Sequence, residues 1–234
     1  MMKLKLTALP HTIRGIYGAA KNELPERMRY LHPDAAASYL ALEAGPHRLH
    51  VSDMWRSAEA SMQARHEKRG VKPPGHSGHN YGLCIDVAVE RVLEQEHWRK
   101  AQLDDFMKEH GWFCHRKDHE RGDEWWHFSF FGKQSDKYLA ASENTGSTAA
   151  GLEQKILDTY GSSFTLSGVD AQGALQTLKL YAGAIDGQLG PLTAQAVRAF
   201  QRTWELPTTG ELDASTQRLL AFMTCSRELV PAAA

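Results

Sequence analysis

The chain has 234 residues, of which 42% are hydrophobic and 24% are charged, and its formal net charge is −1. This length suggests one large or two small domains, and the composition is that of a globular protein. A nearly neutral chain has no strong electrostatic attraction to nucleic acid or to an anionic membrane. Three cysteines without a CxxC pair argue against a disulfide framework. The sequence also has no run of about 20 apolar residues, the length needed to span a membrane.

The N-terminal part is expected to be irregular at first and then to alternate between helix and strand. The first 33 residues are mixed in character and interrupted by prolines, so we expect irregular entry structure there, with at most one helix. A helix is expected from an N-cap at Asp34 to Gly45. Residues 49–54 alternate between apolar and polar side chains and predict a strand, after which Ser57 is expected to cap a second helix.

Two more strands are expected on either side of another helix. Residues 84–89 alternate like a half-buried strand, which sets Asp86 on the face opposite the apolar side chains. Residues 91–110 predict one helix with an apolar face. Residues 125–131 predict a second strand, in which His127 lies opposite the apolar aromatic face.

These strands contain side chains that suit a zinc site. Zinc binds neutral imidazole and carboxylate oxygen at about 2.0–2.2 Å, and a catalytic site keeps a fourth position for water. We interpret His79, Asp86 and His127 as the three ligands of one Zn²⁺ ion. Glu124, at the mouth of the second strand, is interpreted as the catalytic acid and base. Gly82 is expected to allow a tight turn between His79 and the first strand.

The second half of the chain changes character. Small, polar residues without periodicity indicate a flexible linker, which we assign to residues 141–151. The linker separates an expected zinc peptidase domain at residues 1–140 from an expected helical module at residues 152–234. Within that module, residues 185–200 and 209–220 resemble each other. Each segment joins a turn with Gly and Asp to a Thr that could cap a helix, followed by apolar residues at helical spacing.

The helical module resembles the three-helix peptidoglycan-binding domain of cell-wall hydrolases. The segment beginning at Asp186 reads DGQLGPLTAQAVRAFQ and is similar to the family pattern DGxFGxxTxxAVxxFQ, with Leu189 where Phe is usual. The resemblance covers about residues 166–224. It implies that the partner of this chain is bacterial peptidoglycan.

The candidate zinc site resembles that of the zinc D-alanyl-D-alanine carboxypeptidases. Residues 77–86 read SGHNYGLCID and resemble the family pattern SxHxxGxAxD, with Cys84 in place of the usual Ala. Residues 124–127 read EWWH and resemble the second pattern, ExWH. Residues 51–57 are similar to the segment that carries the active-site arginine of the family, which here is Arg56. Relatives include VanY-type carboxypeptidases, VanX-type dipeptidases and the L-alanyl-D-glutamate peptidases of phage endolysins.

The resemblance covers roughly residues 49–131 and implies the fold class and the remaining catalytic residue. The expected fold is α+β, with a small antiparallel sheet under the metal and helices around it, followed by the helical module. Arg56 would hold a substrate carboxylate or stabilise the developing oxyanion, because its positive charge is permanent. The thiol of Cys84 would lie on the metal-facing side of its strand.

Three functions are compatible with these residues. The first is a zinc peptidase that cuts the stem peptides of peptidoglycan. The second is an inactive zinc fold that only binds the cell wall, and the presence of both Glu124 and Arg56 argues against it. The third is a zinc amidase with similar ligands on a different fold, against which the motif order and the ExWH pattern argue. The chain has no HExxH motif, so it is not a zincin.

The scissile bond is harder to predict. Relatives cut either D-Ala-D-Ala or L-Ala-D-Glu, and a wall-binding module favours a polymeric substrate over a free dipeptide. The N-terminus has too short an apolar stretch for a signal peptide, which together with a wall-binding module resembles a phage endolysin. We expect a monomeric lytic endopeptidase that cleaves L-Ala-D-Glu, with a D-Ala-D-Ala carboxypeptidase as the alternative. It would be made in the cytoplasm and reach the periplasm or wall through phage lysis or a secretion system.

Overall fold

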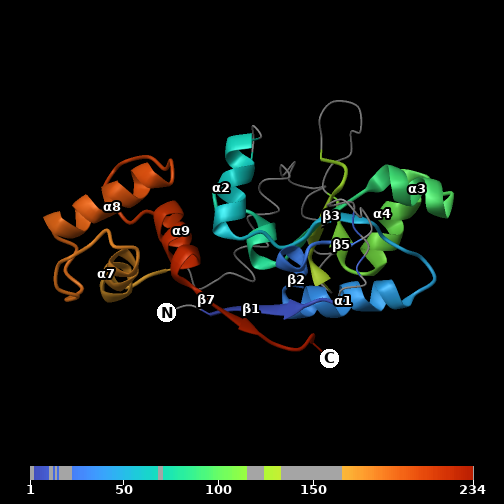
Figure 1. Cartoon of the computed structure of the whole chain (residues 1–234), viewed down its shortest axis with the longest axis horizontal. Coiled ribbons are helices and arrows are strands. Elements are labelled where there is room, and N and C mark those ends of the chain that lie inside the picture. Colours follow the sequence, from blue (N-terminus) through green and yellow to red (C-terminus); the bar gives the residue numbers. More distant parts are fainter. Residues whose placement is uncertain are drawn as a thin grey trace, which may run out of the picture.

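The computed structural model combines an α+β portion with a helical portion near the C-terminal end (Figure 1). The α+β portion is built around two small sheets, and the predicted fold class is confirmed. The structure describes residues 3–10, 13, 15, 23–67, 71–114, 124–132 and 165–233. The expected linker and the first residues of the expected helical module lie outside the described residues, so both stay predictions.

The central sheet is antiparallel and includes the two strands predicted to carry metal ligands. Its strand order is β3 (Val51–Asp53), β4 (Cys84–Val87), β6 (His127–Phe130) and β5 (Trp112–Phe113). In the β4–β6 pair, Asp86 lies opposite His127 and Cys84 lies opposite Ser129. Directly opposed residues share one face of an antiparallel sheet. These four side chains therefore lie on the same face, and the apolar side chains between them lie on the other.

The two strands that carry Asp86 and His127 are both shorter than predicted, for local reasons. β4 ends at Val87 because Ala88 is already the N-cap of the following helix. β6 begins at His127 because residues 125–126 form a turn. In this turn the backbone N–H of His127 donates to the carbonyl oxygen of Glu124 at 2.9 Å. Glu124 therefore lies at the entrance to the strand, just before the turn that leads to the ligand.

The second sheet joins the two ends of the chain. β1 (Lys3–Ala8) pairs antiparallel with β2 (Tyr30–Leu31) and parallel with β7 (Ser226–Leu229), and Figure 1 shows β1 and β7 side by side. Alternation in β1 buries Leu4 and Leu6. The expectation of irregular structure was wrong for this segment. Its alternating pattern is short, and one of its partner strands lies at the opposite end of the chain.

Helices surround the sheets of the α+β portion. Those described are α1 (Pro33–Ala44), α2 (Ala58–Glu67), α3 (Val89–Glu96) and α4 (Lys100–Glu109), with the 3-10 helices η1 (Glu26–Met28) and η2 (Gly78–Tyr81). The prediction of one helix over residues 91–110 was wrong, because His97 takes the left-handed conformation (φ 57°) and ends α3. The predicted N-cap at Asp34 was also wrong. His32 is the N-cap of α1, since Pro33 suits the first helical position.

One apolar core fixes the central sheet. The fully buried side chains of Tyr39 in α1, Trp112 in β5 and Phe128 in β6 all belong to it. The indole N–H of Trp112 donates to the hydroxyl oxygen of Ser38 at 3.0 Å, which joins β5 to α1. Burial of such large apolar side chains is the main favourable contribution to folding. The strands that carry Asp86 and His127 are thereby held on a rigid support.

The helical portion has a second apolar core. Its described helices are α7 (Gly168–Thr177), α8 (Pro191–Thr203) and α9 (Ala214–Thr224). The buried side chains of this core include Ala171, Leu175, Val197, Phe200, Leu219 and Leu220. No described helix of the chain is long and apolar enough to cross a membrane.

A buried glutamine organises the first half of the helical portion. The side-chain oxygen of Gln172 accepts the backbone N–H groups of Asp186 (3.0 Å) and Gly187 (2.7 Å). Its side-chain nitrogen donates to the carbonyl oxygen of Gln188 at 3.0 Å. A buried amide is tolerated when its hydrogen bonds are satisfied, so Gln172 fixes the turn after α7 against that helix.

Gln201 in α8 has the same role in the second half. Its side chain accepts the N–H of Gly210 (2.8 Å) and donates to the carbonyl oxygen of Glu211 (3.0 Å). The two similar segments in the sequence are therefore a structural repeat. The expected threonine caps were wrong. The N-caps of α8 and α9 are Gly190 and Asp213, and the threonines lie inside the first turns.

Gly82 is expected to be essential to the turn between η2 and β4. It has a φ of 66°, and a Cβ there would lie 2.5 Å from the backbone nitrogen of His32 and 2.7 Å from the carbonyl carbon of Leu31. Gly82→Ala should lower the free energy of unfolding by at least about 1–3 kcal/mol, because both strain and overlap result.

The matched control is Gly173→Ala in α7, where the new Cβ would meet only Ile185 Cδ1 at 4.0 Å. Alanine is favoured over glycine in a helix by up to about 1 kcal/mol, so this variant should be neutral or more stable. Urea unfolding of both variants measures the difference. Equal stability of the two variants would contradict the tight approach at Gly82.

Candidate metal centre

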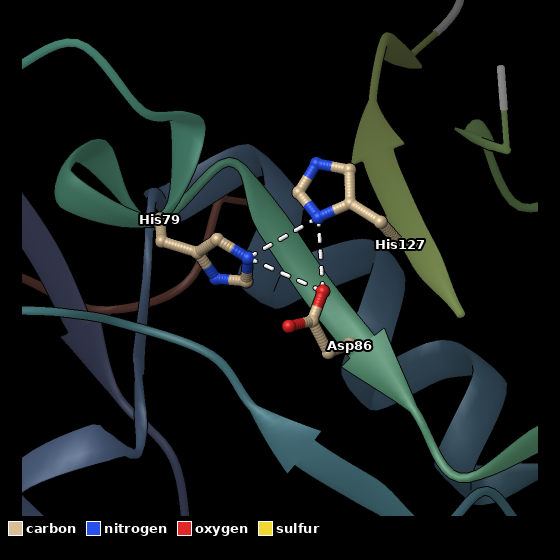
Figure 2. Close-up of side chains that lie close together, drawn as sticks. All are labelled: His79, Asp86 and His127. Carbon is tan, nitrogen blue, oxygen red and sulfur yellow. Dashed lines mark hydrogen bonds and ion pairs between the residues drawn. The ribbon is translucent and has the colours of Figure 1, made fainter. Parts of the chain in front are cut away.

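Three side chains from three elements converge on one point, as Figure 2 shows: His79 from η2, Asp86 from β4 and His127 from β6. Asp86 Oδ1 lies 2.9 Å from His127 Nδ1 and 3.3 Å from His79 Nε2. The two imidazole nitrogens lie 3.3 Å apart. Within the described residues, no other group of three such side chains comes together in this way. The three predicted ligands are therefore brought together by the fold.

The loop before β4 positions His79. η2 begins at Ser77, whose hydroxyl oxygen accepts the backbone N–H of His79 (3.4 Å). The side-chain oxygen of Asn80 accepts the backbone N–H of Ser77 (3.3 Å), which completes a capping box. Gly82 then ends η2 in the left-handed conformation and directs the chain into β4. This short helix presents the imidazole of His79 beside the strand that carries Asp86.

The outward nitrogens of both imidazoles have hydrogen-bond partners. His79 Nδ1 lies 2.5 Å from the carbonyl oxygen of Met54, so this nitrogen must carry the proton. His127 Nε2 lies 3.5 Å from Ser129 Oγ, which in turn lies 3.3 Å from Cys84 Sγ. A ligand imidazole usually donates its other N–H to such a partner. The inward nitrogens, His79 Nε2 and His127 Nδ1, are therefore left to bind a cation.

The donor set fits zinc. Two imidazole nitrogens and one carboxylate oxygen, each contributed by a buried or partly buried side chain, are the ligands of many catalytic zinc sites. Three protein ligands leave one position for water or substrate. The alternation along β4 and β6 and the sheet register bring two of the candidate ligands to one face, and η2 contributes the third.

The charges of the three side chains are strongly coupled. Burial disfavours ionisation of Asp86, but the imidazoles of His79 and His127 act against it and hold the pKa of Asp86 below its usual value. Burial opposes protonation of His79, yet the Asp86 carboxylate raises the pKa of His79. The pKa of His127 is raised well above its usual value, against burial, by Cys84 and Asp86. Without metal, the carboxylate therefore attracts protons to the imidazoles.

The two other predicted site residues have backbone contacts with the candidate ligands. The backbone N–H of Arg56 donates to the carbonyl oxygen of His79 (3.1 Å). The guanidinium Nε of Arg56 donates to Asp53 Oδ2 (3.0 Å), and a second hydrogen bond joins Nη2 to the same oxygen. Glu124 is exposed and precedes the turn that leads to His127. The catalytic roles of Glu124 and Arg56 stay predictions.

Sequence reasoning missed the groups that orient these residues. Asp53 is buried and forms an ion pair with Arg56, which lies three residues later in the chain. This spacing of opposite charges could have been noticed in the sequence. The Met54 carbonyl could not, because a backbone acceptor carries no sequence signal. Ser129 could have been found from its position two residues after His127, on the same face of the strand.

Comparison with known proteins supports part of this assignment. Residues 169–220 match the family model "Putative peptidoglycan binding domain", which confirms the predicted peptidoglycan-binding module over these residues. No curated protein matches the chain. A similar solved structure is that of the LdcB LD-carboxypeptidase, reported to reveal the molecular basis of peptidoglycan recognition. It shares 20% sequence identity over 56% of this chain and 71% of that chain, with a TM-score of 0.41. This likeness is too distant to support a functional argument.

Zinc binding is expected to be coupled to proton release. Since the pKa values of His79 and His127 are raised in the metal-free protein, both imidazoles hold protons at pH values where a free imidazole has lost them. Zinc must displace these protons. The apparent affinity should therefore rise with pH by about tenfold per unit for each proton displaced, and then level off above the raised pKa values.

Calorimetric titration with zinc from pH 6 to pH 8 measures this dependence. Repeating the titration in buffers of different ionisation enthalpy counts the protons released. An affinity that does not change over this range would contradict the coupling between Asp86 and the two imidazoles.

Proposed function

We propose that this chain is a zinc-dependent peptidase that hydrolyses peptide bonds in the stem peptides of peptidoglycan. The observation that carries the proposal is the convergence of His79, Asp86 and His127, whose donor atoms lie within 4.8 Å of one another. The polymer is suggested by the peptidoglycan-binding match at residues 169–220. The proposed domain division is the one expected from the sequence, with the peptidase first and the wall-binding module second.

The chemistry assigns a role to each side chain. Zinc held by the three ligands would supply a Lewis acid and a bound water of lowered pKa. Glu124 would take the proton of the attacking water and return it to the leaving amine. Its location supports this role, because the hydrogen-bonded turn between Glu124 and His127 holds the carboxylate-bearing residue close to a candidate ligand in the chain.

Arg56 would stabilise negative charge. Its guanidinium is paired with Asp53 through two N–H groups, and its side chain is largely buried. Because this guanidinium is already held in place, it loses little further conformational entropy when it binds a carboxylate or an oxyanion. Arg56 follows Met54, whose carbonyl oxygen accepts the hydrogen bond from His79. The same short segment would therefore orient both the guanidinium of Arg56 and a metal ligand.

We propose that the bond cleaved is the one between L-Ala and D-Glu, which would make the chain a lytic endopeptidase of the cell wall. A module that binds the polymer supports an internal bond of the wall over a free dipeptide. The alternative is a D-alanyl-D-alanine carboxypeptidase acting on the ends of stem peptides. In either case the protein would act at the cell wall, and zinc would be its cofactor.

Glu124→Ala is expected to retain zinc and to lose cleavage of isolated cell walls by roughly 10²- to 10⁴-fold, the usual contribution of a general acid–base group. The measurement is release of new amino groups from purified walls, with and without a chelator. Mass spectrometry of the released peptides identifies the cleaved bond.

Glu120→Ala, a change of the same kind in the same charged region of the sequence, serves as the control and should keep its activity. Wall cleavage by Glu124→Ala at the normal rate would exclude the proposed role of this carboxylate. Cleavage by the unmodified chain that survives complete removal of zinc would exclude the metallopeptidase itself.

A further inference from the structure

The last helix of the wall-binding module packs against the loop that leads to His79. Gly75 in this loop has a φ of 79°, and a Cβ there would lie 3.2 Å from Phe222 Cβ and 3.4 Å from Leu219 Cα. The backbone of the loop therefore lies directly against α9. A side chain at position 75 would press on Phe222 and would need the left-handed backbone conformation, so glycine suits this contact.

Two side chains of α9 extend this contact on either side of Gly75. The ring of Phe222 lies edge-on to the ring of Tyr81, with 5.6 Å between centroids and an interplanar angle of 62°. Both rings are almost fully buried, and Phe222 belongs to the core of the α+β portion. At the start of α9, Ser215 Oγ lies 2.8 Å from His76 Nε2. The module thus contributes an apolar and a polar contact to the same loop.

The loop transmits these contacts to the ligand because it is internally hydrogen-bonded. Tyr81 donates its hydroxyl proton to the carbonyl oxygen of Gly75 at 2.8 Å. The side-chain oxygen of the fully buried Asn80 accepts the N–H of Gly75 at 2.9 Å. The side-chain nitrogen of Asn80 donates to the carbonyl oxygen of Arg56 at 2.8 Å. His79 lies between Gly75 and Tyr81, inside this network.

A third contact comes from the strand after α9. The guanidinium of Arg227 in β7 lies over the ring of Trp55, 4.9 Å from its centroid. The indole N–H of Trp55 donates to the carbonyl oxygen of Asn80 at 3.0 Å. Trp55 is the residue between the Met54 carbonyl that holds His79 and the proposed catalytic Arg56. Ser215 and Phe222 therefore contact the loop that carries His79 directly, and Arg227 contacts it indirectly through Trp55.

We propose that the C-terminal module completes the metal site, with Phe222 and Ser215 as positioning residues for the loop that carries His79. This inference rests on the proposed zinc site. It assigns the module a second role besides holding the wall, since these two side chains point at the peptidase portion and Phe222 lies beyond the residues that match the peptidoglycan-binding family. A change at this contact should alter zinc binding although it lies more than 130 residues from His79 in the sequence.

The test compares loss of this contact with loss of aromatic packing elsewhere in the full-length chain. Phe222→Leu removes the ring that contacts Tyr81, and Phe200→Leu removes a fully buried ring from the core of the module. Zinc affinity is measured by competition with a chromophoric chelator. The absorption spectrum of the cobalt(II)-loaded protein reports the ligand geometry. Phe222→Leu combined with Ser215→Ala should weaken zinc binding by roughly 10- to 100-fold, as is typical for residues that orient metal ligands, and should change the cobalt spectrum.

Phe200→Leu should lower the unfolding temperature without either effect. Ser215→Thr keeps the hydroxyl group and should bind zinc like the unmodified chain. If the double variant does not fold, Ser215→Ala alone decides, with an expected loss of roughly 2- to 10-fold, the equivalent of one hydrogen bond.

Unchanged zinc affinity in the folded Phe222 and Ser215 variants would overturn the inference, as would an equal loss in Phe200→Leu. These outcomes differ from a failure of the proposed function. If the proposed function were wrong, the unmodified chain itself would bind no zinc at this site or would not cleave walls. Binding of the variants to purified peptidoglycan should be unchanged, and a matching loss of wall binding would also count against a separate positioning role.

Discussion

The register between β4 and β6 is the constraint on which the candidate site depends. Because side chains alternate along a strand, a slip of one residue would move Asp86 or His127 to the opposite face of the sheet. The register is fixed by burial, since Phe128 and Ile85 lie opposite each other on the apolar face and both are fully buried. The hydrophobic core thus determines that a carboxylate and an imidazole meet on the other face.

The third ligand depends on a different kind of support. His79 lies in a 3-10 helix of four residues, and an element of this length cannot fix a side chain by its own hydrogen bonds. Its position comes from the surrounding contacts: the Met54 carbonyl, the buried Asn80 and, by our inference, α9 of the wall-binding module. The wall-binding module and the proposed peptidase are therefore structurally connected through the loop of one ligand. The parallel pairing of β7 with β1 adds a second connection between them.

Sequence patterns were sufficient to predict that His79, Asp86 and His127 converge, and on which strand faces Asp86 and His127 lie. Alternation around Asp86 and His127 predicted two strands with polar and apolar faces, and the structure pairs them as that pattern requires. What the patterns could not predict is long-range. β1 finds its parallel partner more than 200 residues later in the sequence, and Phe222 packs on a loop that lies more than 140 residues before it. The break at His97 was missed because a left-handed histidine has no distinct apolar periodicity.

X-ray absorption spectroscopy of the zinc-loaded chain, compared with its His127→Ala variant, shows whether His79, Asp86 and His127 bind one ion. We predict a first shell of nitrogen and oxygen at about 2.0–2.2 Å, with the multiple-scattering signature of two imidazoles, reduced to one in the variant. A sulfur ligand at about 2.3 Å, which would come from a cysteine such as Cys84, would contradict this set of ligands. A spectrum that does not change when His127 is replaced would contradict it equally.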